Sequence, residues 1–300
     1  MASGGFVGKG FEKIALEDGN QMPLLAYGLG SRNMLNGANP GLTHSEVVDA
    51  TLMAIENGFY HLDAAEAYGN EAALAEALSK TTVPRSELFV ASKILALPGR
   101  DIEAAFQASL ERLGLDYVDI CLVHFPFKVL DDLPAVWAAF ERIKESGKSK
   151  SIGVSNFTVK HLETILSTAK FPPVVNSIEY HPYLQHGDLI KYCREHKIVV
   201  SAFGLFMPIT KAPGGPVDGL LRDLAKKYSV TESVILLRWC IDQGIAVITT
   251  SGSSQRLQLY RDGISSFRLL PEEVQKICDA GNEKHFRFYY QDYIDAEDRG

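Results

Sequence analysis

The hydrophobic positions of this chain fall into short apolar runs that are separated by longer amphipathic stretches. The runs are rich in Val, Ile, Phe or Tyr and span 24–28, 59–63, 88–93, 118–124, 151–155, 174–180, 198–203 and 245–250. Runs of this length and composition are typical of strands that are covered on both faces.

Helical patterns fill the intervals between these runs. SEVVDATLMAIENG (45–58) starts with a Ser that can cap a helix and ends with a Gly, and DIEAAFQASLERLG (101–114) places its apolar residues at helical spacing. Similar patterns cover 133–147, 158–169, 187–196, 218–228 and 231–244, and a last helix follows Pro271.

Strands that alternate with helices predict a parallel sheet, and eight such units in about 250 residues match a closed (β/α)8 TIM barrel of the α/β class. A doubly wound open sheet is the alternative, and it is favoured by a Gly-rich fingerprint after the first strand. GLGSRN (28–33) is too short for that fingerprint and is not followed directly by a helix.

Two segments lie outside the alternation, within what we predict to be a single domain over residues 1–300. FEKIALEDGNQMP (11–23) predicts an N-terminal hairpin with a DGN turn, placed to close the bottom of the barrel. The C-terminal tail, 283–300, is aromatic and then acidic.

Composition narrows the range of partners and compartments. The chain has 300 residues, 46% hydrophobic and 22% charged, and a net charge of -7, which argues against nucleic acid or an anionic membrane as a partner. It has no bilayer-length apolar run, and its N-terminus lacks the apolar core of a signal peptide. Four cysteines without a CxxC pair suit reduced thiols in the cytoplasm rather than disulfides or a zinc site. The default expectation is a monomer, because no apolar helix face is spare.

Polar side chains follow the second, third and fourth predicted strands. Asp63 ends the second strand, Tyr68 lies in the loop after it, Lys93 ends the third strand and His124 ends the fourth. The carboxyl ends of barrel strands share one mouth, so these four groups are expected to meet there. Lys93, held by Asp63, is expected to lower the pKa of the Tyr68 phenol, and a neutral His124 is expected to donate to a carbonyl oxygen.

Each of these residues also has a purely structural interpretation, as a surface Lys, a packed Tyr or a His bonded to backbone. Their coincidence at one end of consecutive strands favours the catalytic interpretation. Lys and His at strand ends would also suit a Schiff-base aldolase, in which Lys93 would be the nucleophile.

Five motifs carry a resemblance to a known family. They are GFYHLDAAEAYGNE (58–71), SK (92–93), LVHFP (122–126), GVSNF (153–157) and NSIEYHPYL (176–184). In order and spacing, from about residue 10 to about residue 285, the chain resembles the aldo-keto reductases. Within that family, NSIEYHP, VITTS and FRFYYQDY resemble fungal reductases of conjugated polyketones and ketolactones.

The resemblance implies a (β/α)8 barrel that reduces carbonyl groups with a nicotinamide cofactor, usually NADPH, without a metal or flavin. It assigns Asp63, Tyr68, Lys93 and His124 to the catalytic tetrad, with Tyr68 as general acid. The nicotinamide C4 is then the source of the hydride, and the protein positions the reactants. A non-catalytic NADP(H)-sensing subunit on the same barrel is an alternative, which the intact tetrad disfavours.

The resemblance also assigns a cradle for the nicotinamide. It implies that Ser155 and Asn156 hold the carboxamide, since a hydroxyl and a side-chain amide match its donors and acceptor. Ser177 stands where the family usually has Gln, so this contact is expected to be lost or bridged by water. Phe203 keeps the stacking face, whereas GLFMP (204–208) replaces the usual Ser-Pro-Leu.

The residues after the last strand bear on the cofactor's 2′-phosphate. Ser251, Ser253, Arg256 and the first-turn amides of a following helix are expected to bind it. Thr250 stands where the family usually has Lys, which predicts NADPH over NADH by a reduced margin. Leu259 and Tyr260 replace the usual Glu-Asn pair, and Tyr260 is a candidate to stack on adenine.

The candidate substrate pocket combines apolar walls with a few polar groups, as suits a small carbonyl compound. The predicted walls are Arg32, Phe125 and Phe206, together with Ser31, Asn33, Phe286, Phe288, Tyr289 and Tyr290. Arg32 is a candidate to attract a carboxylate or keto-ester, and the tail aromatics have packing on the barrel as their alternative. We predict a reductase of ketones or of activated dicarbonyl compounds.

Overall fold

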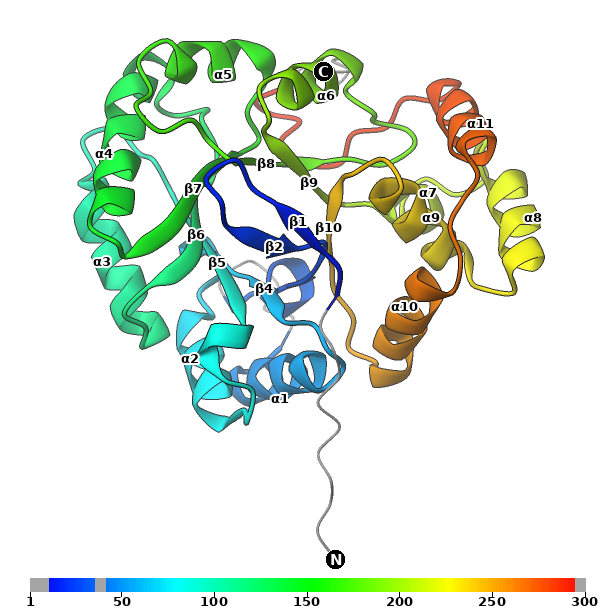
Figure 1. The fold of residues 1–300 in the computed structure, drawn as a ribbon, viewed down its shortest axis with the longest axis horizontal. Coiled ribbons are helices and arrows are strands. Elements are labelled where there is room, and N and C mark those ends of the chain that lie inside the picture. Colours follow the sequence, from blue (N-terminus) through cyan, green and yellow to red (C-terminus); the bar gives the residue numbers. More distant parts are fainter. Residues whose placement is uncertain (1–10, 36–41, 295–300) are drawn as a thin grey trace, which may run out of the picture.

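The computed structural model describes residues 11–35 and 42–294, apart from the side chain of Arg32, and a closed parallel barrel lies at its centre (Figure 1). In order around the barrel, the strands are β3 (Leu25–Gly28), β4 (His61–Asp63), β5 (Phe89–Ile94), β6 (Val118–Val123), β7 (Ser149–Ser155), β8 (Val175–Glu179), β9 (Val199–Phe203) and β10 (Ala246–Thr249), which pairs with β3. Each strand coincides with a predicted apolar run. The predicted TIM barrel is therefore confirmed, and the doubly wound open sheet is wrong.

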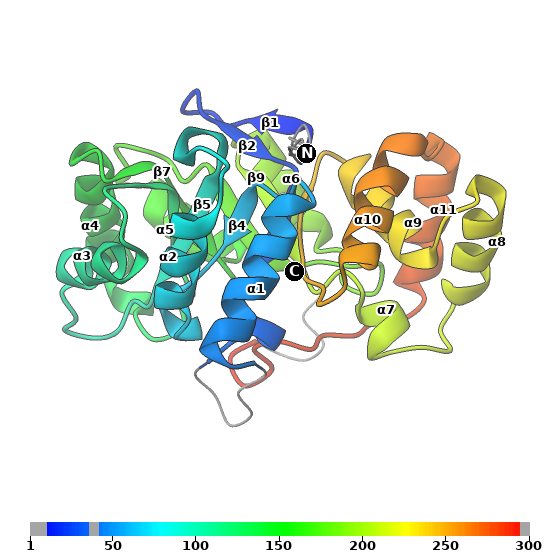
Figure 2. The same cartoon turned by 90° about the horizontal axis from the view of Figure 1, so that it is seen from below.

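Helices surround this barrel on the outside (Figures 1 and 2). They are α1 (His44–Glu56), α2 (Glu71–Lys80), α3 (Ile102–Leu113), α4 (Leu133–Glu145), α5 (Val159–Leu166), α6 (Gly187–Glu195), α7 (Met207–Thr210), α8 (Asp218–Tyr228), α9 (Glu232–Ile241), α10 (Ser254–Ser266) and α11 (Pro271–Asn282). The sequence analysis gives no range for α2, α7 or α10. Within the described ranges, every helix is too short or too polar to cross a bilayer.

Local signals begin and end these helices. The cap of α1 is Thr43, whose side chain and that of Glu46 form a capping box, so the predicted Ser45 cap is wrong by two positions. Asp101 caps α3 by accepting a hydrogen bond from the Ala104 amide, and Gly114 ends it in a left-handed conformation.

The predicted N-terminal hairpin is confirmed and lies at the amino end of the barrel. Its strands β1 (Lys13–Ala15) and β2 (Gln21–Pro23) pair antiparallel. Leu16 and Met22 are buried in one cluster with Phe89, Ile120 and Leu122 from the barrel strands. Burial of these side chains closes the bottom of the barrel, which leaves the opposite end as the open mouth.

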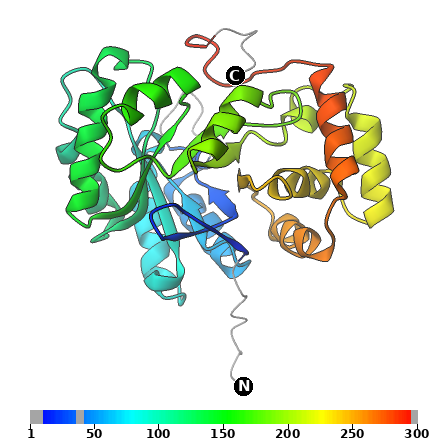
Figure 3. The ribbon, with the colours of Figure 1, turned by 45° about the horizontal axis from the view of Figure 1, so that its top comes forward.

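The C-terminal segment lies at that opposite end. Figure 2 shows the hairpin on one side of the barrel and the red segment after α11 on the other, and Figure 3 shows this segment crossing from α11 towards α5 and α6. The connection between β9 and β10 carries α7, α8 and α9. The C-terminal segment and the β9–β10 connection therefore both border the mouth of the barrel.

Candidate active site

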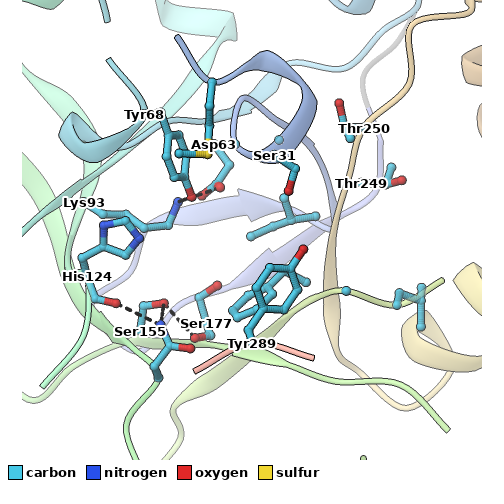
Figure 4. A pocket seen from close by; sticks show the side chains of 18 of the residues that line it. Ser31, Asp63, Tyr68, Lys93, His124, Ser155, Ser177, Thr249, Thr250 and Tyr289 are labelled. Carbon is cyan, nitrogen blue, oxygen red and sulfur yellow. Dashed lines mark hydrogen bonds and ion pairs between the residues drawn. The ribbon is translucent and has the colours of Figure 1, made fainter. Parts of the chain in front are cut away.

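A cavity of about 550 Å³ opens among the carboxyl ends of the barrel strands (Figure 4). The predicted site residues that line it are Asp63, Tyr68, Lys93, His124, Phe125, Ser155, Asn156, Ser177, Phe203, Phe206 and Thr250. Parallel strands bring their carboxyl ends to one mouth, and this is why residues far apart in sequence meet here.

Lys93 is the centre of the polar group in this cavity. Its Nζ lies 2.7 Å from Asp63 Oδ2 and donates hydrogen bonds to the Ala64 carbonyl oxygen at 3.0 Å and to the Tyr68 hydroxyl at 3.3 Å. An ammonium has three protons, and all three are used. Because the Tyr68 oxygen accepts from Lys93, its own proton can be donated towards the cavity.

Strand register and one close approach account for this geometry. Asp63 is paired with Ala91, and the side chains of Ala91 and Lys93 share one face of β5, so Asp63 and Lys93 are neighbours. Tyr68 ends a short 3₁₀ turn, η2 (Glu66–Tyr68), directly after β4. A Cβ at Gly30 would lie 2.9 Å from Tyr68 Cζ, so only a glycine there leaves room for the phenol ring.

The charges of this group are set by burial and by one another. Burial by itself lowers the pKa of Lys93, but Asp63 and Tyr68 outweigh burial, so the pKa lies above its ordinary value. Burial raises the pKa of Tyr68, and the opposing effect of Lys93 is smaller. Lys93 lowers the pKa of Tyr68, as expected, but desolvation outweighs this effect, so the resulting pKa lies above its ordinary value. Tyr68 keeps its proton at neutral pH, as a proton donor must.

His124 completes the polar corner as a neutral imidazole. Its ring meets that of Tyr68 edge to face, with centroids 5.8 Å apart, and burial together with Lys93 lowers its pKa to about 3. Its buried Nδ1 makes no hydrogen bond within the described part of the chain. The structure thus brings together all four residues of the predicted tetrad (Figure 4).

The predicted carboxamide cradle lies beside His124. Ser155 Oγ donates to the Ser177 carbonyl oxygen at 2.9 Å, and Asn156 Nδ2 donates to the His124 carbonyl oxygen at 3.0 Å. Asn156 adopts a left-handed φ of 63°, which Asn tolerates better than most residues. Ser177 Oγ is buried on the cavity wall without a hydrogen bond to another described residue, so it can still bind a ligand.

Aromatic side chains form the apolar wall. Phe203 lines the cavity at the end of β9, and Tyr289 from the C-terminal segment meets its ring edge to face, with centroids 5.3 Å apart. Phe206 also lines the cavity and packs on Tyr260, which is buried. Burial under Phe206 means that Tyr260 presents no open face for stacking on adenine, contrary to the expectation.

The predicted 2′-phosphate residues divide into two groups. Thr250 lines the cavity, whereas Ser251, Ser253 and Arg256 do not contribute to its wall. Ser253 is the N-cap of α10, where its Oγ accepts a hydrogen bond from the Arg256 amide at 3.3 Å. The Arg256 side chain is exposed. Ser251 is buried, Ser253 is half-buried and only Arg256 is exposed; these three residues and Thr250 are called the 2′-phosphate ledge below.

The predicted substrate walls are also split. Phe125, Ser31, Tyr289 and Tyr290 line the cavity, whereas the side chain of Arg32 lies outside the part of the chain that the structure describes. Other predicted walls have structural roles or face away. Asn33 is fully buried and donates to the Gly28 carbonyl oxygen and the Tyr27 hydroxyl, Phe286 packs on the core, and Phe288 is exposed.

Some lining residues carry no signal that the sequence analysis uses. Thr249 is buried on the wall, and its Oγ1 has no hydrogen-bond partner among the described residues. It directly precedes Thr250 at the end of β10, so its place at a strand end could have identified it. Met34 lies in a loop, and only the fold brings it to the wall. Met207, the first residue of α7, belongs to the GLFMP segment that is expected to reshape this rim.

The polar wall fits a nicotinamide group. Ser177 Oγ, Thr249 Oγ1 and His124 Nδ1 are buried without hydrogen-bond partners in the described ranges, and all belong to residues that line the cavity. Buried polar atoms normally bind a partner, so these three indicate a polar ligand. Phe203 supplies an aromatic ring beside them.

Comparisons with known proteins agree with this geometry. The model of the aldo/keto reductase family matches residues 26–212. An NAD/NADP-dependent indole-3-acetaldehyde reductase of Schizosaccharomyces pombe is 34% identical over 276 residues, covering 90% of this chain and 96% of the relative. An NADPH-dependent alpha-keto amide reductase of Saccharomyces cerevisiae is 34% identical over 292 residues, covering 92% and 93%.

A solved structure gives the same answer. The crystal structure of a Bombyx mori aldo-keto reductase in complex with NADP superimposes with a TM-score of 0.84 at 31% identity, covering 96% of this chain and 98% of that one. The sequence resemblance, the barrel and the predicted type of activity, an oxidoreductase of carbonyl groups, are confirmed at the level of the family. The chain belongs to the aldo-keto reductase family.

Proposed function

We propose that this enzyme reduces ketones and aldehydes to alcohols with NADPH, and that Tyr68 is the general acid. The observation that carries the proposal is the contact of Lys93 Nζ with the Tyr68 oxygen, which leaves the phenolic proton free for the cavity. A neutral His124 stands across the same space and offers a second donor.

Tyr68 and His124 act on the carbonyl oxygen, where negative charge develops as the carbonyl carbon is reduced. Donors that are aimed in advance at such an oxygen stabilise the transition state without reorganisation. As Tyr68 releases its proton, the phenolate that remains lies beside the Lys93 ammonium, and Asp63 keeps that ammonium in place. When bound, the nicotinamide supplies the hydride.

We assign the cofactor to the polar wall and the ledge beside it. Ser155, Asn156 and Ser177 would hold the carboxamide, and Phe203 would cover the ring. Thr250, Ser251, Ser253 and Arg256 would receive the 2′-phosphate. Arg256 is a cation beside the start of α10, but Thr250 adds no charge, so the preference for NADPH over NADH is expected to be modest. The fission yeast relative carries both cofactors in its name, which supports a small margin.

The substrate class is inferred from the cavity walls. Apolar and aromatic side chains, including Phe125, Phe206 and Tyr290, form much of these walls, and Tyr68 and His124 contribute polar groups. Such a site suits an apolar ketone next to a second electron-withdrawing carbonyl: an α-dicarbonyl, a keto-ester or a ketolactone. The budding yeast relative is named for an alpha-keto amide, which has this arrangement. A monomer in the cytoplasm remains our expectation.

Lys93 argues against the Schiff-base alternative. A nucleophilic Lys must be neutral, yet the pKa of Lys93 is raised by Asp63 and Tyr68, and its protons are engaged in three hydrogen bonds. The test is NADPH oxidation across a panel of simple sugars, aldehydes, α-dicarbonyls and keto-esters, repeated with NADH. Turnover of dicarbonyls and keto-esters above sugars supports the proposal. A panel led by sugars overturns the substrate class, and NADPH binding without any turnover supports a sensing subunit instead.

A further inference from the structure

Glu179, the last residue of β8, connects the barrel to the C-terminal segment. Its Oε1 accepts a hydrogen bond from the Phe288 amide, and its Oε2 accepts one from the Tyr289 amide, each at 2.9 Å. His181 Nε2 lies 3.3 Å from Oε1. The carboxylate is 3% exposed, and a buried carboxylate is stable only where donors surround it. Backbone amides of the segment supply two of these donors.

These two bonds determine where the next side chains lie. Tyr289 packs against Phe203, while Tyr290 lies 6.0 Å from the ring of Phe125, so the two tyrosines contact different walls of the cavity. Tyr290 also lines the cavity together with Asn156, whose side chain opposes the burial that raises the pKa of Tyr290. The segment therefore reaches both the apolar wall and the carboxamide cradle.

Two backbone features show that this position needs an anchor. Tyr290 adopts a φ of 59°, a left-handed conformation that a bulky residue keeps only when its surroundings hold it. Gly204 has a φ of 71°, and a Cβ there would lie 3.3 Å from Glu179 Cγ and 3.5 Å from Tyr289 Cε2. The close approach of Glu179 and Tyr289 is thus built around this glycine.

We propose that Glu179 is a positioning residue that fixes Tyr289 and Tyr290 as a wall of the substrate cavity and thereby selects for substrates large enough to contact it. The inference rests on the proposed carbonyl reduction. Glu179 does not line the cavity itself, and it acts through the two amide bonds. A keto-ester with a ring has more apolar surface to place against this wall than a three-carbon dicarbonyl bound at Tyr68.

The kinetic test compares ethyl benzoylformate, a keto-ester with a ring, with methylglyoxal, a three-carbon dicarbonyl. In Glu179→Gln one amide faces an NH₂ group instead of an oxygen, so that bond is lost. We expect the KM for ethyl benzoylformate to rise about tenfold, with kcat within about threefold, and the KM for methylglyoxal to change less than about twofold. In the Tyr289→Ala background, adding Glu179→Gln should raise the KM for ethyl benzoylformate by less than about twofold, because the two residues act as a unit.

Glu141→Gln is the matched control. Glu141 Oε1 also accepts two backbone amides, from Lys170 and Phe171 at 2.6 and 2.8 Å, but outside the residues that line the cavity. It should alter Tm without altering either KM. Equal KM changes for both substrates in Glu179→Gln, or additive effects with Tyr289→Ala, would overturn the proposal.

Hydrogen exchange tests the anchor without relying on activity. In the wild-type enzyme, the Phe288 and Tyr289 amides should exchange at least about tenfold more slowly than those of Gln291 and Asp292, and Glu179→Gln should remove this protection. If that variant does not fold, the wild-type measurement still decides, since unprotected amides at 288 and 289 overturn the proposal. Protected amides in an enzyme that reduces neither substrate would retain the anchor and overturn only the proposed function and the selectivity that depends on it.

Discussion

The catalytic corner and the 2′-phosphate ledge are built in different ways. In the corner, Lys93 and Asp63 are 3% and 4% exposed, extend from adjacent strands and make hydrogen bonds within the protein. On the ledge, Arg256 is exposed, and the Ser253 hydroxyl is used to cap α10. Strand pairing therefore sets the positions of the tetrad side chains, whereas the residues to which we assign the cofactor's 2′-phosphate include a side chain, Arg256, that is exposed to water.

The largest expected effect comes from removing the phenolic proton. Tyr68→Phe should lower kcat by about 10²–10⁴-fold, because a positioned general acid contributes that much. NADPH oxidation with a keto-ester measures it, and an NADPH fluorescence titration should show unchanged binding. Tyr192→Phe, on α6 and outside the cavity wall, should keep wild-type turnover. If the Tyr68→Phe enzyme keeps more than a tenth of the wild-type kcat, Tyr68 is not the general acid.

Breaking the buried ion pair should also lower the stability of the fold. Asp63→Asn leaves Lys93 charged and buried beside a neutral amide, which should lower the free energy of unfolding by about 3 kcal/mol. Urea denaturation measures this change. Glu76→Gln, which breaks an exposed pair with Lys80, is the comparison and should leave the midpoint nearly unchanged. Equal midpoints for the two variants would contradict the contrast between buried and exposed charges.

The third prediction concerns pH. The pKa of His124 is about 3 in the folded state and 6.5 in the unfolded chain, so the unfolded state binds more protons between these values. The stability from His124 is complete above pH 6.5 and is lost as the pH falls towards 3. Each pH unit below 6.5 lowers the free energy of unfolding by about 1.4 kcal/mol, so the contribution of His124 has fallen by about 2 kcal/mol at pH 5.

His124→Gln removes this titration, so its stability should fall less steeply between pH 6.5 and 5. Urea denaturation at several pH values gives the slope. Parallel slopes in the variant and the wild-type enzyme would show that His124 is not buried as a neutral ring.

The smallest expected effect lies on the ledge. Thr250→Lys should raise the NADPH-to-NADH ratio of kcat/KM about tenfold, and Arg256→Gln should lower it by a similar factor, since a charged hydrogen bond contributes about 1.5 kcal/mol. Arg261→Gln, which alters an α10 arginine paired with Asp262, should leave the ratio unchanged. If neither Thr250→Lys nor Arg256→Gln changes this ratio, the 2′-phosphate must bind elsewhere.

Much of the fold could be predicted because apolar periodicity is a local property. The strand ranges, the hairpin and the ends of α3 follow from alternation, turn residues and caps, and the structure confirms them. The tetrad was predictable because each member follows a strand that the pattern identifies. Thr249 was missed although it ends a strand, and Met34 was missed because nothing in its neighbourhood distinguishes a wall residue from a packed one.

The sequence by itself determined the eight parallel strands, the four polar residues at one mouth and the family. Tertiary structure alone decided the charge states, because burial raises the pKa of Tyr68 although Lys93 opposes it. It also decided which loop residues line the cavity and joined Glu179 to amides more than 100 positions later. The periodicity of apolar residues is a property of neighbouring positions and can be found in the sequence. Desolvation and backbone contacts between distant segments arise only when the chain is packed.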